Sequence, residues 1–397
     1  MNIWRPPDMT TPFQTYLGQK LSEIDEVGLR RKLREIESVQ GAKISVGARK
    51  LLNFSSNDYL GLARHPALKE STVEAVRLFG AGAGSARLIS GSLAVLHELE
   101  AAAAAFKGAE ASLSFSSGYA AALGTVPVLV GEGDIVVVDK LVHSSLVDAA
   151  RLSGAKLRVF KHNDLVDLER ILKWARESGV NTLIITESVF SMDGDIAPLE
   201  NIVKLKEAYG AWLMLDEAHA VGLYGKGRRG IAEELEVTDR VEVQMGTLGK
   251  ALGAAGGLIC GSQALVDLLI NRARSFIYST APVPAQAAAA RQAIELICSD
   301  EGGILQARLW KNVEKLKNSL TGCGWKLPAM QSAILPLIVG AEDDAVALSE
   351  RLLEAGIWVP AVRYPTVARG EARLRITVSA AHTDEDIEIL LEALGDA

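Results

Sequence analysis

The feature of this sequence that most limits its fold is a series of short apolar runs between about residues 111 and 261. They alternate with longer stretches of helical periodicity that end at glycine, such as 164–179 and 199–210. Near-continuous Val, Ile and Leu is typical of strands covered on both faces. The pattern predicts βαβ units and an α/β fold on a parallel sheet. The apolar runs cover residues 111–115, 133–139, 181–187, 211–217, 241–245 and 256–261.

The chain length favours more than one domain. At 397 residues the chain is longer than one hydrophobic core usually organises. We predict a large α/β domain over residues 57–284 and a smaller C-terminal α+β domain over residues 285–397. The N-terminal segment, residues 1–56, is expected to pack beside the small domain.

The composition excludes several classes of protein. Apolar residues make up 49% of the chain and charged residues 23%, as in an ordinary globular protein. A net charge of −7 offers no broad attraction for nucleic acid or an anionic membrane, and neither partner is expected. The 3 cysteines have no CxxC spacing, which argues against a disulfide framework or a metal site. No long apolar run or signal-peptide pattern occurs, so we expect a cytoplasmic location.

Polar side chains follow five of the apolar runs, where each predicted strand ends. Ligands of open parallel α/β sheets bind outside the carboxyl ends of the strands. If the runs share one sheet, these groups therefore meet in one pocket. They are Ser117, Gly118 and Tyr119; His143; Glu187 and Ser191; Asp216 and His219; and Thr247 and Lys250.

Lys250 stands out among these groups because it lies in "MGTLGKALGAAGG" (245–257), with only small or apolar neighbours. Removal of water from a lysine favours its neutral form. A neutral amine is a nucleophile that forms a Schiff base with a carbonyl compound or with pyridoxal phosphate (PLP). A lysine on a solvated turn would fit this segment alone equally well. The position of Lys250 after a strand favours the functional interpretation.

The other groups each have a functional and a structural interpretation. The Ser-Gly turn at 116–119 could seat a phosphate at a helix N-terminus, helped by the Thr247 hydroxyl, or could simply cap the helix. Asp216 could pair with a protonated pyridine nitrogen or form a structural ion pair. His219 could bind a ring substituent and His143 could stack on the ring, although single histidines are often only packed side chains.

Arg375 lies in a later segment, "EARLRITVSAAH" (371–382). An arginine fork binds a carboxylate through two hydrogen bonds, which suits an amino-acid substrate. A surface ion pair is the alternative for this residue.

Together these motifs resemble the α-oxoamine synthases, PLP enzymes of the aspartate aminotransferase fold (fold type I). The similarity runs in order from about Leu29 to the C-terminus. Besides the Lys250 segment, the motifs include "NFSSNDYLGLARHP" (53–66), "GAGSARLISGSLAVLHELE" (82–100), "TESVFSMDGDIAPL" (186–199) and "LDEAHAVGLYGKGRRG" (215–230).

The resemblance implies a role for each matched residue. Lys250 would form the Schiff base with PLP and Asp216 would pair with its ring nitrogen. His143 would stack on the ring and assist proton transfer. The remaining cofactor contacts would come from His219, Ser191, Ser117, Gly118, Tyr119 and Thr247. The substrate contacts would come from Asn57, Arg375, Thr366 and Arg30, although the local alignment allows Arg31 in place of Arg30.

The resemblance also implies a reaction and an assembly. The reaction would be decarboxylative condensation of an amino acid with an acyl-CoA, and we expect L-alanine and pimeloyl-CoA, in biotin biosynthesis. The protein would be a homodimer with active sites at the subunit interface, where residues 278–282 reach the neighbour's phosphate. The alternatives are a member of the family that uses glycine and acetyl-CoA, an aminotransferase of the same fold, and a non-enzymatic nucleotide-binding module. Against the last, the chain has no GxGxxG fingerprint after the first strand and no GxxxxGK[ST] loop.

Overall fold

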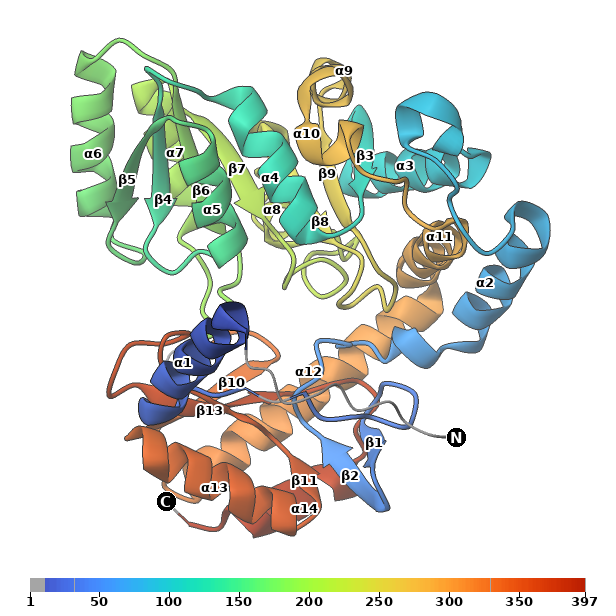
Figure 1. Ribbon diagram of the computed structural model, residues 1–397, viewed down its shortest axis with the longest axis vertical. Helices are drawn as coiled ribbons and strands as arrows, with labels where there is room; N and C mark the ends of the chain where they lie inside the picture. The colour runs from blue at the N-terminus through green and yellow to red at the C-terminus, as the bar shows by residue number, and fades with distance from the viewer. Residues whose placement is uncertain (1–10, 32, 329, 397) are drawn as a thin grey trace.

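The computed structural model describes residues 11–31, 33–328 and 330–396, and a seven-stranded sheet forms the core of its larger part (Figure 1). Its strand order is β3–β9–β8–β7–β6–β4–β5. Neighbours from β5 to β8 pair in parallel, whereas β9 pairs antiparallel with both β8 and β3. The strands are β3 (Ala111–Phe115), β4 (Ile135–Asp139), β5 (Lys156–Phe160), β6 (Thr182–Glu187), β7 (Trp212–Asp216), β8 (Val243–Thr247) and β9 (Gly257–Gly261).

All six predicted apolar runs lie in this sheet, so the predicted α/β fold class is confirmed. Three details differ from the prediction. The last run, β9, is antiparallel to its neighbours. β8 ends at Thr247, so that residue belongs to the strand and does not follow it. β5 was not predicted, because this edge strand exposes Lys156 and Val159 and lacks the apolar pattern of a buried strand.

Helices cover both faces of the large sheet (Figure 1). This cover explains why Val137, Ile184 and Leu213 in the central strands are fully buried. The helices of this part are α2 (Pro66–Phe79), α3 (Ala94–Lys107), α4 (Gly118–Leu129), α5 (Ser144–Leu152), α6 (Leu165–Glu177), α7 (Leu199–Tyr209), α8 (Ile231–Glu234), α9 (Gln263–Arg272), α10 (Arg274–Ile277) and α11 (Pro284–Cys298).

Two smaller sheets form the second part of the molecule (Figure 1). β13 (Ala372–Thr377) lies between β10 (Ile334–Gly340) and β12 (Ala361–Val362) and pairs antiparallel with both. The second sheet joins β1 (Lys43–Val46) and β2 (Arg49–Asn53) to β11 (Ile357–Trp358). The helices of this part are α1 (Pro12–Glu26), α12 (Asp300–Gly322), α13 (Glu342–Glu354) and α14 (Asp384–Leu394).

The packing supports a two-domain description, which we put forward as a proposal. β2 pairs with β11, and this contact supports the predicted position of the N-terminal segment beside the small domain; residues 1–10 lie outside the described residues. α11 packs against α2 and α3, and α12 packs against α14. We therefore propose that the division lies between α11 and α12, later than the boundary at 284 that the sequence suggested.

Candidate active site

The carboxyl ends of three neighbouring strands bring acidic groups and Lys250 to one place. Glu187 of β6 lies opposite Asp216 of β7, and Asp216 lies opposite Met245 of β8. Because adjacent strands are about 4.8 Å apart, Glu187 and Asp216 lie close together at this edge of the sheet. Lys250 follows β8, and its positive charge acts on both acids.

The Lys250 amine is held by a short chain of buried polar groups. Its Nζ lies 2.7 Å from Nε2 of His219, and Nδ1 of His219 lies 2.6 Å from the Tyr59 hydroxyl. Burial lowers the pKa of His219 well below its ordinary value, so the ring is neutral. Burial raises the pKa of Tyr59 to about 12, so its hydroxyl keeps its proton. A neutral imidazole thus orients the amine.

Burial also changes the acid–base properties of Lys250 itself. Removal from water lowers its pKa to about 8, although the negative charges of Asp216 and Glu187 oppose this change. The nearby Arg375 guanidinium lowers it further. Lys250 therefore has an accessible neutral form near physiological pH, which a nucleophile and a proton acceptor both need.

Asp216 and Glu187 are both almost completely buried, with 5% and 3% of their surfaces exposed. Burial raises the pKa of each carboxyl, and that of Glu187 reaches about 8 because Asp216 adds its negative charge. The backbone N–H of Ala218 donates to Asp216 Oδ1 over 2.9 Å, and this is the single hydrogen bond to the Asp216 carboxylate within the described residues. A buried carboxylate with so few donors is well matched to a cationic partner.

His143 occupies the N-cap of α5, and its ring accepts a hydrogen bond from the Ser145 N–H. Its backbone N–H donates to Oε1 of Glu187 over 2.5 Å. Burial lowers the pKa of the His143 ring, and the charge of Asp216 opposes this change. This hydrogen bond to Glu187 holds the start of α5, with His143, at the sheet edge.

The turn from β3 into α4 has the features of a phosphate seat. Ser117 caps the helix by accepting the Ala120 N–H over 3.0 Å, and the next two N–H groups belong to Gly118 and Tyr119 in the first turn. A Cβ added to Gly118 would lie 3.9 Å from the Thr247 Cβ, so β8 borders this turn. A Cβ at Gly257 would lie 2.5 Å from the Ser117 carbonyl oxygen, which shows why β9 needs glycine here.

Arg375 lies on β13 and reaches the large sheet. Its Nε donates to the Ser191 carbonyl over 2.5 Å, its Nη1 to the Thr377 hydroxyl over 2.9 Å and its Nη2 to Asn57 Oδ1 over 3.2 Å. It forms no ion pair with a carboxylate in the described part of the chain. Its charge is therefore available for the carboxylate of a substrate.

Two predicted substrate contacts, Arg30 and Thr366, form no hydrogen bond or ion pair with this cluster in the described residues. Arg30 is an exposed residue whose side chain pairs with Asp25 over 3.1 Å. The alternative residue, Arg31, is also exposed. Thr366 is exposed on the loop after β12, and its N–H donates to the Arg363 carbonyl.

The sequence interpretation did not select Tyr59, and it named Glu187 without giving it a role. Tyr59 belongs to the "NDYLGL" segment (57–62), but nothing in that segment links it to a histidine 160 residues later. Glu187 ends a buried strand, and this position was the only available signal.

The cluster fits PLP on its own chemistry. A partly buried lysine with a lowered pKa suits an aldehyde, a buried carboxylate suits a protonated pyridine nitrogen, and a helix N-terminus suits a phosphate. Lys250, Asp216 and the 117–119 turn supply these three features within one sheet edge.

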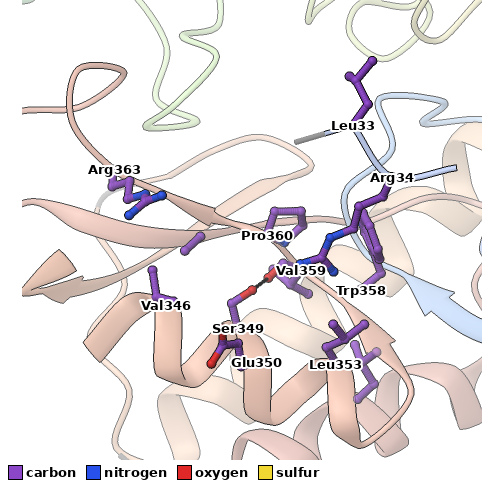
Figure 2. A pocket seen from close by; sticks show the side chains of 12 residues that line it. Leu33, Arg34, Val346, Ser349, Glu350, Leu353, Trp358, Val359, Pro360 and Arg363 are labelled. Atoms are coloured by element: carbon purple, nitrogen blue, oxygen red, sulfur yellow. Dashed lines mark hydrogen bonds between the residues drawn. The ribbon is translucent and has the colours of Figure 1, made fainter. Parts of the chain in front are cut away.

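A separate groove of about 360 Å³ lies between α13, β11, β12 and the N-terminal segment (Figure 2). Arg34 places its guanidinium 5.1 Å from the centre of the Trp358 ring, and Arg363 lies at the other end. The groove contains none of the predicted site residues. It is therefore distinct from the cluster at the sheet edge.

Comparison with known proteins gives consistent results. The family model for aminotransferase class I and II matches residues 49–394. This chain belongs to that family. It is 46% identical to the 8-amino-7-oxononanoate synthase of Geobacter sulfurreducens over 378 residues, which cover 95% of this chain and 96% of the relative. It is 44% identical to the same-named protein of Symbiobacterium thermophilum, with the same coverage.

The solved structures agree with the fold. A serine palmitoyltransferase variant from S. paucimobilis has a TM-score of 0.90 to this chain at 26% identity, covering 98% of this chain and 97% of its own. That structure holds a PLP–myriocin aldimine. The predicted fold type I architecture and the resemblance to α-oxoamine synthases are confirmed. Among the described residues, no helix combines the length and the apolar character needed to cross a bilayer.

The lowered pKa of Lys250 can be measured in the cofactor-free protein. Reductive methylation at a series of pH values, followed by peptide mass spectrometry, should give a midpoint near 8 for Lys250 and near 10.5 in urea. Because the Asp216 charge raises the Lys250 pKa, Asp216→Asn should move the native midpoint below that of the wild type. A native midpoint close to 10.5 would contradict the desolvation argument.

Proposed function

We propose that this protein is a PLP-dependent acyltransferase that condenses an amino acid with an acyl-CoA and releases CoA and CO₂, the reaction expected of an 8-amino-7-oxononanoate synthase in biotin biosynthesis. The observation that carries the proposal is the meeting of Lys250, His219 and Asp216 at one edge of the sheet. The similarity to proteins of that name along 95% of the chain supports the specific reaction.

The proposed PLP contacts combine the geometry of the sheet edge with the roles that the family resemblance implies. Lys250 would attach to its aldehyde carbon, and Asp216 would face the ring nitrogen. The 117–119 turn and Thr247 would hold the phosphate, with His143 over the ring and His219 and Ser191 near the ring oxygen. When bound, PLP supplies an electrophilic carbon and a cationic ring that takes up negative charge from the Cα of an amino acid.

Asp216 supports this chemistry through its charge. A buried carboxylate raises the pKa of a cationic group beside it, so Asp216 would favour the protonated form of the ring nitrogen. The Ala218 N–H orients the carboxylate from behind. Within the described residues the carboxylate accepts this one hydrogen bond, which leaves its other oxygen available for a cationic partner.

Lys250 has a second task as a base. With a pKa lowered to about 8, its Nζ can take a proton from the Cα of the amino acid and return one later. His219, fixed by the Tyr59 hydroxyl, holds this nitrogen in position. We propose that His143, beside the same acids, assists proton transfer to the product.

Arg375 and Asn57 would bind and orient the amino acid. The Arg375 guanidinium carries a positive charge without an acidic partner in the described part of the chain, and Asn57 lies 3.2 Å from it. A substrate carboxylate would complete this pair. Thr366 and Arg30 stay predictions for contacts with the acyl-CoA.

The homodimer and the cytoplasmic location also stay predictions. Support for a dimer comes from exposed apolar residues beside the bridge between Ala86 and Thr280. Ile89 is 81% exposed and Tyr278 is 73% exposed, and a second copy of the chain would cover such residues.

A CoA-release assay tests the function and separates the alternatives. With alanine, serine or glycine crossed against acyl-CoAs of graded length, we expect the fastest CoA and CO₂ release from L-alanine and pimeloyl-CoA. Fastest release from glycine and acetyl-CoA would assign the protein to the other branch of the family. Formation of pyridoxamine phosphate with an amino acid alone, and no CoA release, would identify an aminotransferase and refute the proposal.

The role of Asp216 has its own test. Asp216→Asn protein should still bind PLP, but exchange of the alanine Cα hydrogen with solvent should slow by about 100-fold or more, because the charge that holds the ring proton is lost. Proton NMR of alanine in D₂O measures this rate. Exchange at the wild-type rate would remove Asp216 from its proposed role.

A further inference from the structure

The loop of residues 190–195, which follows β6 in the large part of the molecule, contacts the small part, and we call it the bridging loop. It is closed on itself, because the Phe190 N–H donates to the Asp195 carbonyl over 3.0 Å and the Gly194 N–H donates to the Phe190 carbonyl over 2.9 Å. Val189 and Ile196 form a bridge at its base. The loop is therefore a firm support for its side chains.

Two arginines of β13 contact the bridging loop. Arg373 Nη1 lies 2.6 Å from Asp193 Oδ1, and Arg375 Nε donates to the Ser191 carbonyl over 2.5 Å. Residues two apart on a strand face the same side, so both side chains extend from β13 toward the loop. Any movement of β13 relative to the loop would displace both.

The bridging loop packs closely against the small domain. The Gln331 N–H donates to the Gly194 carbonyl over 3.1 Å. Gly194 has a φ of +69°, and a Cβ added there would lie 2.4 Å from the Ile334 carbonyl oxygen. The loop is thus seated directly against the start of β10.

The two arginines differ in their charge balance. The Arg373 side chain is only 3% exposed, and its second acidic neighbour, Glu371, is 59% exposed at 3.4 Å. Asp193 is therefore its main counter-charge, and its loss would leave this buried cation with the exposed Glu371 as its acidic neighbour. Arg375 contacts Ser191, Thr377 and Asn57, none of which carries a charge.

We propose that Arg373 is a positioning residue whose ion pair with Asp193 holds β13 on the bridging loop and thereby fixes Arg375 for the substrate carboxylate. This inference rests on the proposed function, in which Arg375 binds the amino acid. Arg373 itself does not touch the substrate. Its loss should weaken amino-acid binding more than it slows the chemical steps.

A double-mutant cycle in the holoenzyme tests the proposal. Asp193→Asn and Arg373→Gln should each raise the KM for the amino acid about tenfold, with kcat changed by less than about threefold. The double variant should resemble the worse single variant, because both changes remove the same interaction. Multiplying KM effects in the double variant, or unchanged KM values in both single variants, would overturn the proposal.

Hydrogen exchange gives a second readout that does not depend on activity. Amides of β13 and of the bridging loop should exchange faster in Asp193→Asn than in the wild type, while those of β4 stay unchanged. Arg170→Gln is the matched control, because Arg170 forms an exposed ion pair with Asp167 over 2.6 Å and should alter neither KM nor exchange in β13. Unchanged exchange in β13 of Asp193→Asn would refute the positioning role.

The two readouts separate this proposal from the proposed function. If the wild-type protein released no CoA with any amino acid, the proposed function would fail, and the exchange measurement would still decide whether Asp193 holds β13. If Arg373→Gln did not fold, as judged by near-ultraviolet circular dichroism, Arg373→Lys would take its place beside Asp193→Asn in the double-mutant cycle.

Discussion

The active-site cluster places a lysine that is largely removed from water beside two buried carboxyl groups. Burial lowers the pKa of Lys250 and raises those of Asp216 and Glu187, so every group at this sheet edge is pushed toward its neutral form. The attraction between Lys250 and the two acids opposes that shift, whereas repulsion from Asp216 adds to it at Glu187. The balance keeps the Lys250 amine near the point where it can both gain and lose a proton, and this property suits covalent and acid–base catalysis.

The fold produces this arrangement through the register of its parallel strands. Because Glu187 lies opposite Asp216 and Asp216 opposite Met245, three chain segments that are distant in sequence end side by side. The apolar strands behind them exclude water, and the small domain supplies Arg375 from the other side. The cluster therefore needs both parts of the molecule.

The sequence was sufficient to predict six of the seven strands of the sheet and several residues at its edge, since strand periodicity and position after a strand are local properties. Lys250, His219 and Asp216 were found in this way, and the structure brings them together. Tyr59 was missed because its contact with His219 is made by packing across 160 residues. The antiparallel direction of β9 and the exposed edge strand β5 were missed because direction and edge position are set by neighbouring strands. Arg30 and Thr366 came from the family resemblance alone, and no local pattern supported them.

The most direct test of the central claim is to locate the lysine that PLP modifies. Borohydride reduction of the PLP-bound protein, followed by peptide mass spectrometry, should place the phosphopyridoxyl group on Lys250 at close to one equivalent per chain. Modification of another lysine, or none above the background of unfolded protein, would contradict the claim that the partly buried amine at this sheet edge is the reactive one.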